Sequence, residues 1–99
     1  MTYIVKWSIK ARDDVRRLYS HLLDFDEDAA AHAYKAITEA VAFLEHFPFS
    51  CRKARDGDAL LRELLVPFGS SGNVILFRVD DGGTVTAAAV RHQREDDYH

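Results

Sequence analysis

A continuous apolar run near the C-terminal end, Asn73 to Val79, constrains the fold more than any other stretch of the chain. It is rich in β-branched and aromatic residues, which favours a β-strand. The run stops at Asp80-Asp81-Gly82-Gly83, and Asp-Gly and Gly-Gly pairs tolerate the positive φ angles of tight hairpin turns. Because the next run, Thr84 to Val90, is again β-branched or small, the two segments are predicted to pair antiparallel.

A third candidate strand, Leu61 to Val66, precedes this pair. It ends at Pro67, and the flexible link Gly69-Ser70-Ser71-Gly72 follows. The three segments together predict a three-stranded antiparallel meander. A sheet this apolar needs cover on at least one face, and the sequence upstream is expected to supply it.

The N-terminal residues alternate in character from Tyr3 to Ile9, with Tyr3, Val5, Trp7 and Ile9 on one face. This period of two predicts a strand with one buried face.

Two helices are predicted to follow. The first begins near Ala11, since the acidic pair Asp13-Asp14 suits the first turn of a helix. Its apolar residues at helical spacing are Val15, Leu18, Tyr19 and Leu22. The second runs from near Glu27 to about His46, with Asp26 as a plausible N-cap. Its apolar positions are Ala30, Ala33, Ile37, Val41 and Leu44.

The order strand, two helices, three strands predicts an α+β fold, in which a helical hairpin from Ala11 to about His46 covers an antiparallel sheet. With 99 residues, the chain is expected to be one domain, 1–99.

The segment that joins helix and sheet, Phe47 to Ala59, is predicted as a loop and carries a basic cluster of Arg52, Lys53 and Arg55. One interpretation is a solvated loop that keeps the protein soluble. The other is a contact patch for an acidic partner or for nucleic acid.

Composition restricts the class of protein. The formal net charge of −3 argues against blanket neutralisation of phosphates, so direct nucleic-acid binding is not expected. Cys51 is the single cysteine, which excludes an internal disulfide and suits a reducing cytoplasm. No signal peptide and no apolar stretch of roughly 20 residues is recognisable, so we expect a cytoplasmic protein that does not enter the membrane.

No motif specifies catalysis. The histidines lack metal-ligand spacing, so neither a metal nor a cofactor is expected. More informative are the basic residues that interrupt or end the apolar strands, namely Arg62, Arg78, Arg91 and His92. They could be solvent-facing residues with packed stems, or they could converge on the uncovered face of the sheet. Strand register decides between these alternatives and cannot be read from the sequence.

Several short segments resemble one protein family in their order and spacing. They are Ala11-Arg12-Asp13-Asp14, Ala29-Ala30, Phe47-Pro48, Leu60 to Leu64, Gly69 to Val79, and Val90 to Glu95. This pattern is similar to that of the RelE/ParE family of type II toxins and covers nearly the whole chain. The resemblance implies a small cytoplasmic toxin encoded with an antitoxin, whose extended or helical tail wraps and silences the toxin.

The family has two main activities. RelE-like members cleave messenger RNA on the ribosome with basic side chains, and the strand positions that carry them fall near Leu65, Pro67 and Gly69 of this chain. None of these can hold a phosphate or move a proton. The Arg-His-x-Arg-Glu ending is similar instead to the ParE-like branch, which poisons DNA gyrase without a catalytic site. The residues expected to contact the target are Arg62, Arg78, Arg91, His92 and Arg94.

Two alternatives stay open at this point. A RelE-like ribonuclease would rely on Arg91, His92 and Tyr98 near the C-terminus. A degenerate, non-toxic binding module is suggested by Asn73, where the family commonly has tyrosine, and by the weakly packing Ala87-Ala88-Ala89.

Overall fold

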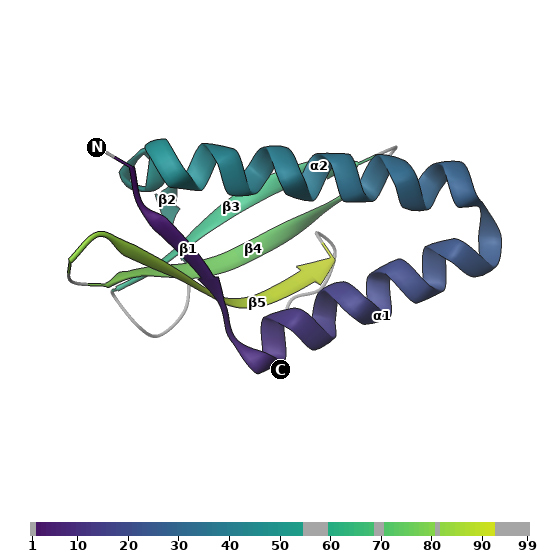
Figure 1. Cartoon of the computed structure of the whole chain (residues 1–99), viewed down its shortest axis with the longest axis horizontal. Helices are drawn as coiled ribbons and strands as arrows, with labels where there is room; N and C mark the ends of the chain where they lie inside the picture. Colours follow the sequence, from purple (N-terminus) through teal and green to yellow (C-terminus); the bar gives the residue numbers. More distant parts are fainter. Residues whose placement is uncertain (1, 55–59, 69–70, 81, 93–99) are drawn as a thin grey trace.

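The computed structural model describes residues 2–54, 60–68, 71–80 and 82–92. Its elements in chain order are β1 (Ile4–Trp7), α1 (Ile9–Phe25), α2 (Glu27–His46), the 3₁₀ helix η1 (Pro48–Ser50), β2 (Arg52–Lys53), β3 (Leu61–Phe68), β4 (Ser71–Asp80) and β5 (Thr84–His92). The strands form one sheet in the order β1-β5-β4-β3-β2. Figure 1 shows the two helices as an antiparallel pair on one side of the sheet, with their junction projecting beyond the strand ends.

The predicted meander and the α+β class are confirmed. β3 pairs antiparallel with β4, and β4 pairs antiparallel with β5. Gly82 and Gly83, between β4 and β5, have φ angles of 76° and 86°. These are angles that side-chain-bearing residues rarely adopt, which is why the glycines occur where the hairpin reverses.

The first strand is shorter than predicted and runs in an unexpected direction. β1 pairs parallel with β5, with Ile4 opposite Thr84 and Trp7 opposite Ala87, so the sheet is mixed rather than antiparallel. The alternation is confirmed within the strand, since Val5 and Trp7 pack against the core while Ile4 is exposed. The prediction that Ile9 lies on the buried face of the strand is wrong, because Ile9 begins α1 and is 80 % exposed. A parallel pair requires a long crossover connection, and here the helical hairpin and the meander supply it.

The first helix begins at Ile9 rather than Ala11. Ser8 is its N-cap, and the Ser8 hydroxyl accepts a hydrogen bond from the backbone N–H of Ala11 at 3.0 Å. The prediction that Asp13 and Asp14 occupy the first turn is therefore wrong, because this cap starts the helix earlier. The predicted cap of α2 is confirmed: the carboxylate of Asp26 accepts from the backbone N–H of Asp28 at 2.9 Å.

The segment predicted as a loop contains regular structure. η1 follows α2, and β2 then pairs antiparallel with β3, with Arg52 opposite Glu63 and Lys53 opposite Arg62. A two-residue strand is too short to produce a recognisable sequence pattern, which explains why it was missed. Arg55 lies outside the described residues.

The core lies between the helices and the sheet. α1 packs against β5 and α2 against β3, and small buried residues on the helices, such as Ala11 and Ala40, allow a close approach to the sheet. Phe77 and Ile75 of β4 are fully buried beneath them. The sheet face that carries these residues is called the inner face below, and the opposite side is called the outer face.

Candidate functional site

Strand register sorts the predicted site residues onto two faces of the sheet. Arg62 lies opposite the core residue Phe77, and His92 lies two residues beyond the core residue Val90, so both are on the inner face. Arg78 and Arg91 are on the outer face. They lie opposite Thr86 and Val74, respectively. The structure therefore places two of these four residues on each face, and the four do not converge on one surface. Arg94 and Tyr98 lie outside the described residues.

Arg62 makes contacts that tie β3 to the segment before β2. It donates a hydrogen bond to the backbone carbonyl of Cys51 at 2.7 Å, and its guanidinium lies 5.3 Å from the ring centroid of Phe49. Burial raises the pKa of the Cys51 thiol, and the nearby charge of Arg62 offsets part of that increase.

On the outer face, a buried carboxylate holds two arginines from neighbouring strands. Glu63 of β3 is 4 % exposed, and its carboxylate lies 2.6 Å from Nε of Arg52 and 4.0 Å from Nη2 of Arg91. Arg91 also donates to the carbonyl of His92 at 3.0 Å. A carboxylate withdrawn from water requires such cationic partners, so these three residues act as one unit, named the Glu63 cluster.

A second ion pair lies on the same face, at the hairpin end of β4. Arg78 donates to Asp80 at 2.8 Å, and the hydroxyl of Thr86 donates to the same carboxylate at 2.5 Å. The hydrogen bond from Thr86, followed by that from Arg78, lowers the pKa of Asp80.

Apolar side chains of β4 lie between Arg91 and Arg78 on the outer face. Val74 and Leu76 are buried on the outer face, and Leu65, which lies opposite Val74, is 46 % exposed. The four residue steps from Val74 to Arg78 correspond to roughly 13 Å along the strand. The outer face is therefore an apolar strip with Arg91 at one end and Arg78 at the other, and Glu63 lies beside its middle, opposite Leu76.

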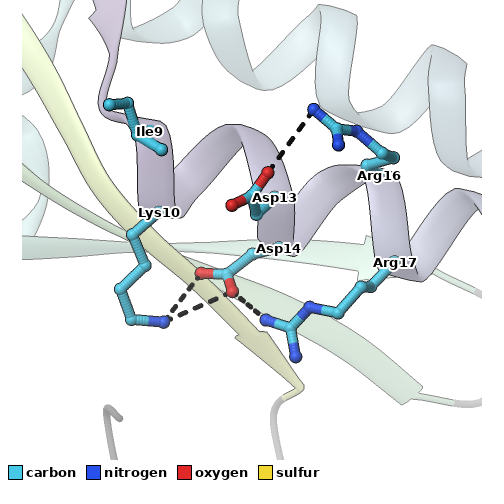
Figure 2. A pocket seen from close by; sticks show the side chains of 6 residues that line it. All are labelled: Ile9, Lys10, Asp13, Asp14, Arg16 and Arg17. Atoms are coloured by element: carbon cyan, nitrogen blue, oxygen red, sulfur yellow. Dashed lines mark hydrogen bonds and ion pairs between the residues drawn. The ribbon is translucent and has the colours of Figure 1, made fainter.

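An open depression of about 570 Å³ lies at the start of α1, and Figure 2 shows the side chains that line it. Asp14, whose side chain is 2 % exposed, is its central residue. Lys10 lies 3.2 Å from the carboxylate, Arg17 is paired with it, and the backbone N–H of Val90 donates to it at 2.9 Å. Asp14 thus fastens α1 to β5, which is a structural role.

Sequence reasoning missed Glu63 and Asp14. Glu63 is the only acidic residue between Leu60 and Val66, and an acid within an apolar strand is a signal that could have identified it. Asp14 gave no such signal, because acids near a helix start are common. Among the described residues, no three side chains of metal-binding type come together. No helix in that part of the chain is long and apolar enough to cross a membrane.

Comparison with known proteins identifies similar chains over nearly the whole length. The family model described as ParE toxin of type II toxin-antitoxin system, parDE, matches residues 5–97. The Toxin RelE1 of Caulobacter vibrioides is 32 % identical over 95 residues, which cover 96 % of this chain and 98 % of the relative.

Two solved structures have a similar fold. One is from the chromosomal ParDE system of P. aeruginosa, with a TM-score of 0.71 and 21 % identity over 91 % of this chain and 95 % of that chain. The other is a mutant of the E. coli toxin RelE in the free state, with a TM-score of 0.63 and 15 % identity over 95 % of this chain and 86 % of that chain.

Proposed function

Because the chain belongs to the ParE toxin family, within the RelE/ParE group of type II toxins, we propose that it binds and poisons DNA gyrase and that a cognate antitoxin neutralises it. The proposal treats the toxin as a binding protein rather than an enzyme.

The composition of the outer face supports a protein target. Leu65 and Pro67 are exposed there, and Arg91 and Arg78 lie at the two ends of the apolar strip. Arg52 lies beside the strip, opposite Glu63. Apolar side chains bordered by arginines are typical of protein interfaces, where arginine pairs with acidic groups and packs through its stem.

The same face is poorly suited to RNA cleavage. Attack by a ribose 2′-hydroxyl needs a positioned base and cationic groups that are available to the phosphate. Glu63 lies beside Arg91 and repels a phosphate, and His92 lies on the inner face. Leu65 and Pro67, at positions where the resemblance implied basic residues, offer neither charge nor proton.

The proposal is tested by adding the purified protein to gyrase and supercoiled DNA. We expect cleaved DNA that depends on gyrase, and a graded loss of several-fold for Arg78→Ala and for Arg91→Ala, because binding energy is distributed over an interface. Arg16→Ala is the matched control, since the Arg16 side chain is 75 % exposed on α1. Gyrase that is unaffected by the wild-type protein would rule the proposal out.

A ribosome-dependent messenger RNA endonuclease is the second candidate. This second candidate is supported by the 32 % identity to a relative that bears the name RelE1. Adding the protein to translating ribosomes separates the two activities. Messenger cleavage that a single change at His92 or Tyr98 abolishes would identify the ribonuclease, because removing a general acid or base costs about 10²–10⁴-fold in rate.

The antitoxin part of the proposal is tested with the protein encoded next to this gene. Co-expression is expected to yield a complex that co-purifies and to restore growth to cells that produce the toxin. A neighbouring protein that neither co-purifies nor restores growth would contradict this part, whatever the target is.

A further inference from the structure

A cleft of about 180 Å³ lies where β1, α1 and α2 meet. Figure 1 shows β1 running from the end of α2 to the start of α1, which brings the three elements together. The described residues that line the cleft are Trp7 of β1, Arg12 and Val15 of α1, and Ile37 of α2. It is called the Trp7 cleft below.

The walls of the Trp7 cleft are apolar and only partly covered by the protein. Trp7, Val15 and Ile37 are each half-buried. Trp7 and Val15 also pack against the hydrophobic core, which limits the motion of both side chains. The cleft therefore presents apolar surface that a ligand can cover, and covering it is favourable.

Of the described residues that line the cleft, only Arg12 is charged. Its side chain is exposed, and in the described part of the chain no carboxylate lies within ion-pair distance of it. The neighbouring acid, Asp13, lines the depression around Asp14 instead and pairs with Arg16 at 3.4 Å. Successive residues of a helix point about 100° apart, which explains why Asp13 does not reach the cleft. Arg12 can therefore pair with an anion from outside the protein.

Trp7 contributes a second group that can bind a ligand. Its indole N–H is a hydrogen-bond donor and makes no hydrogen bond to any residue that the structure describes. Indole N–H groups that are withdrawn from water usually have an acceptor. An oxygen atom of a ligand in the cleft can serve as that acceptor.

The larger depression around Asp14 differs in this respect. Its cations Lys10 and Arg17 pair with Asp14, and Arg16 pairs with Asp13. An anion would have to compete there with carboxylates of the protein, one of which is buried. Of the two hollows, the Trp7 cleft is therefore the one suited to an anionic ligand.

We propose that the Trp7 cleft binds a small organic carboxylate that carries one apolar group of about the size of an aromatic ring. The carboxylate pairs with Arg12, whose planar guanidinium matches two oxygens, and the apolar group lies against Trp7, Val15 and Ile37. The volume sets the size, since an apolar cavity of about 150 Å³ holds one benzene molecule and drug-sized ligands need about 300 Å³ or more. This binding site is separate from the outer face and does not depend on the target of the toxin.

Two other classes of ligand fit less well. A nucleotide needs more space and more than one cation for its phosphates. Inorganic phosphate or acetate can pair with Arg12 but leaves the apolar walls of the cleft uncovered. One cation beside apolar walls therefore favours an organic monoanion.

The test adds 3-phenylpropionate to the purified chain. Trp7 is the only tryptophan, so its fluorescence reports on the cleft itself. We expect a saturable change with a Kd of about 1 mM, as is typical of a ligand of roughly ten heavy atoms. The matched control ligand is 3-phenylpropanamide, which has the same shape without the charge and should bind about fivefold more weakly or worse.

Variants test the two parts of the site separately. Arg12→Gln should weaken binding of 3-phenylpropionate about fivefold or more and leave binding of the amide unchanged, because it removes the charge alone. Arg16→Gln is the matched control on the same helix, with a side chain that is 75 % exposed, and should change Kd less than about twofold. Ile37→Phe fills the cleft and should prevent binding of both ligands, with circular dichroism to show that the variant folds.

An NMR titration gives a readout that does not depend on fluorescence. The indole N–H resonance of Trp7 should shift on addition of 3-phenylpropionate, and by more than the backbone amide of Arg17, which lines the depression around Asp14. No shift of the indole resonance at about ten times the expected Kd would overturn the proposal. Equal binding of acid and amide, or an Arg12→Gln variant that binds like the wild type, would show that the cleft does not select carboxylates. Acetate that binds as tightly as 3-phenylpropionate would contradict the role of the apolar walls.

Discussion

At the scale of single residues, burial of charge explains how the outer face is organised. Glu63 is almost completely withdrawn from solvent, and the Arg52 side chain beside it is 65 % exposed whereas that of Arg91 is 15 % exposed. If the carboxylate were lost, Arg52 could return to water, but Arg91 would stay largely buried. The orientation of Arg91, a residue proposed to contact the target, therefore depends on Glu63.

Glu63→Gln is expected to lower the free energy of unfolding by about 1–3 kcal/mol, because it removes a buried charge that cationic partners compensate. Urea denaturation monitored by circular dichroism measures the change. Glu39→Gln, at an exposed position of α2, is the matched control and should alter stability by less than about 0.5 kcal/mol. Equal midpoints for the two variants would show that the cluster does not stabilise the fold.

Asp80 should make the stability of the fold depend on pH, and the direction of its pKa shift fixes the sign of that dependence. Its pKa is lower in the folded state, mainly through the hydrogen bond from Thr86. Its contribution to stability is therefore present above the unfolded-state pKa, about 3.9, and is lost as pH falls through the lowered folded-state value. Thr86→Val should raise the Asp80 pKa, as measured by an NMR titration of its carboxyl carbon. A titration midpoint that does not move would contradict this assignment.

At the scale of elements, α1 replaces β1 along the edge of β5. β1 pairs with β5 as far as Ala87. Beyond that point, the hydroxyl of Ser8 donates to the carbonyl of Ala88 at 2.9 Å, and Asp14 accepts from the backbone N–H of Val90. The register shift of β5 against β4 lies in the same stretch. Side chains from the helix thus satisfy backbone groups that a strand would otherwise pair.

Asp14→Ala should destabilise the protein by about 1–3 kcal/mol, since it leaves the backbone N–H of Val90 without its acceptor, whereas Lys10 and Arg17 can return to solvent. Hydrogen exchange at the Val90 amide should accelerate in this variant. Asp13→Ala serves as the control, because the Asp13 side chain is 52 % exposed and pairs only with Arg16 among the described residues. Unchanged exchange at Val90 would show that Asp14 does not fasten the two elements.

The elements that were predictable are those with local signals. Apolar runs bounded by turn residues identified the meander, and periodicity identified both helices, with the Asp26 cap marking the start of the second. The parallel pairing of Ile4 with Thr84 joins distant parts of the chain, and no local pattern encodes it. The same reason made the site hard to predict: Arg62 and Arg78 resemble each other in sequence, and only strand register places them on opposite faces.

At the scale of the whole molecule, neighbouring residues of β2 belong to opposite faces of the sheet. Arg52 joins the Glu63 cluster on the outer face, while the next residue, Lys53, lies opposite the inner-face residue Arg62. This arrangement explains how a partner at the edge of the sheet could also block the outer face.

Binding of the antitoxin should stabilise the folded toxin by an amount that rises with the logarithm of its free concentration once this exceeds Kd. A ligand that binds only the native state adds about 2.7 kcal/mol at 100 times its Kd. The melting temperature of the toxin should accordingly rise with each addition of the protein encoded next to its gene, as measured by differential scanning fluorimetry. A melting temperature that is independent of the added protein would mean that it does not bind the folded chain.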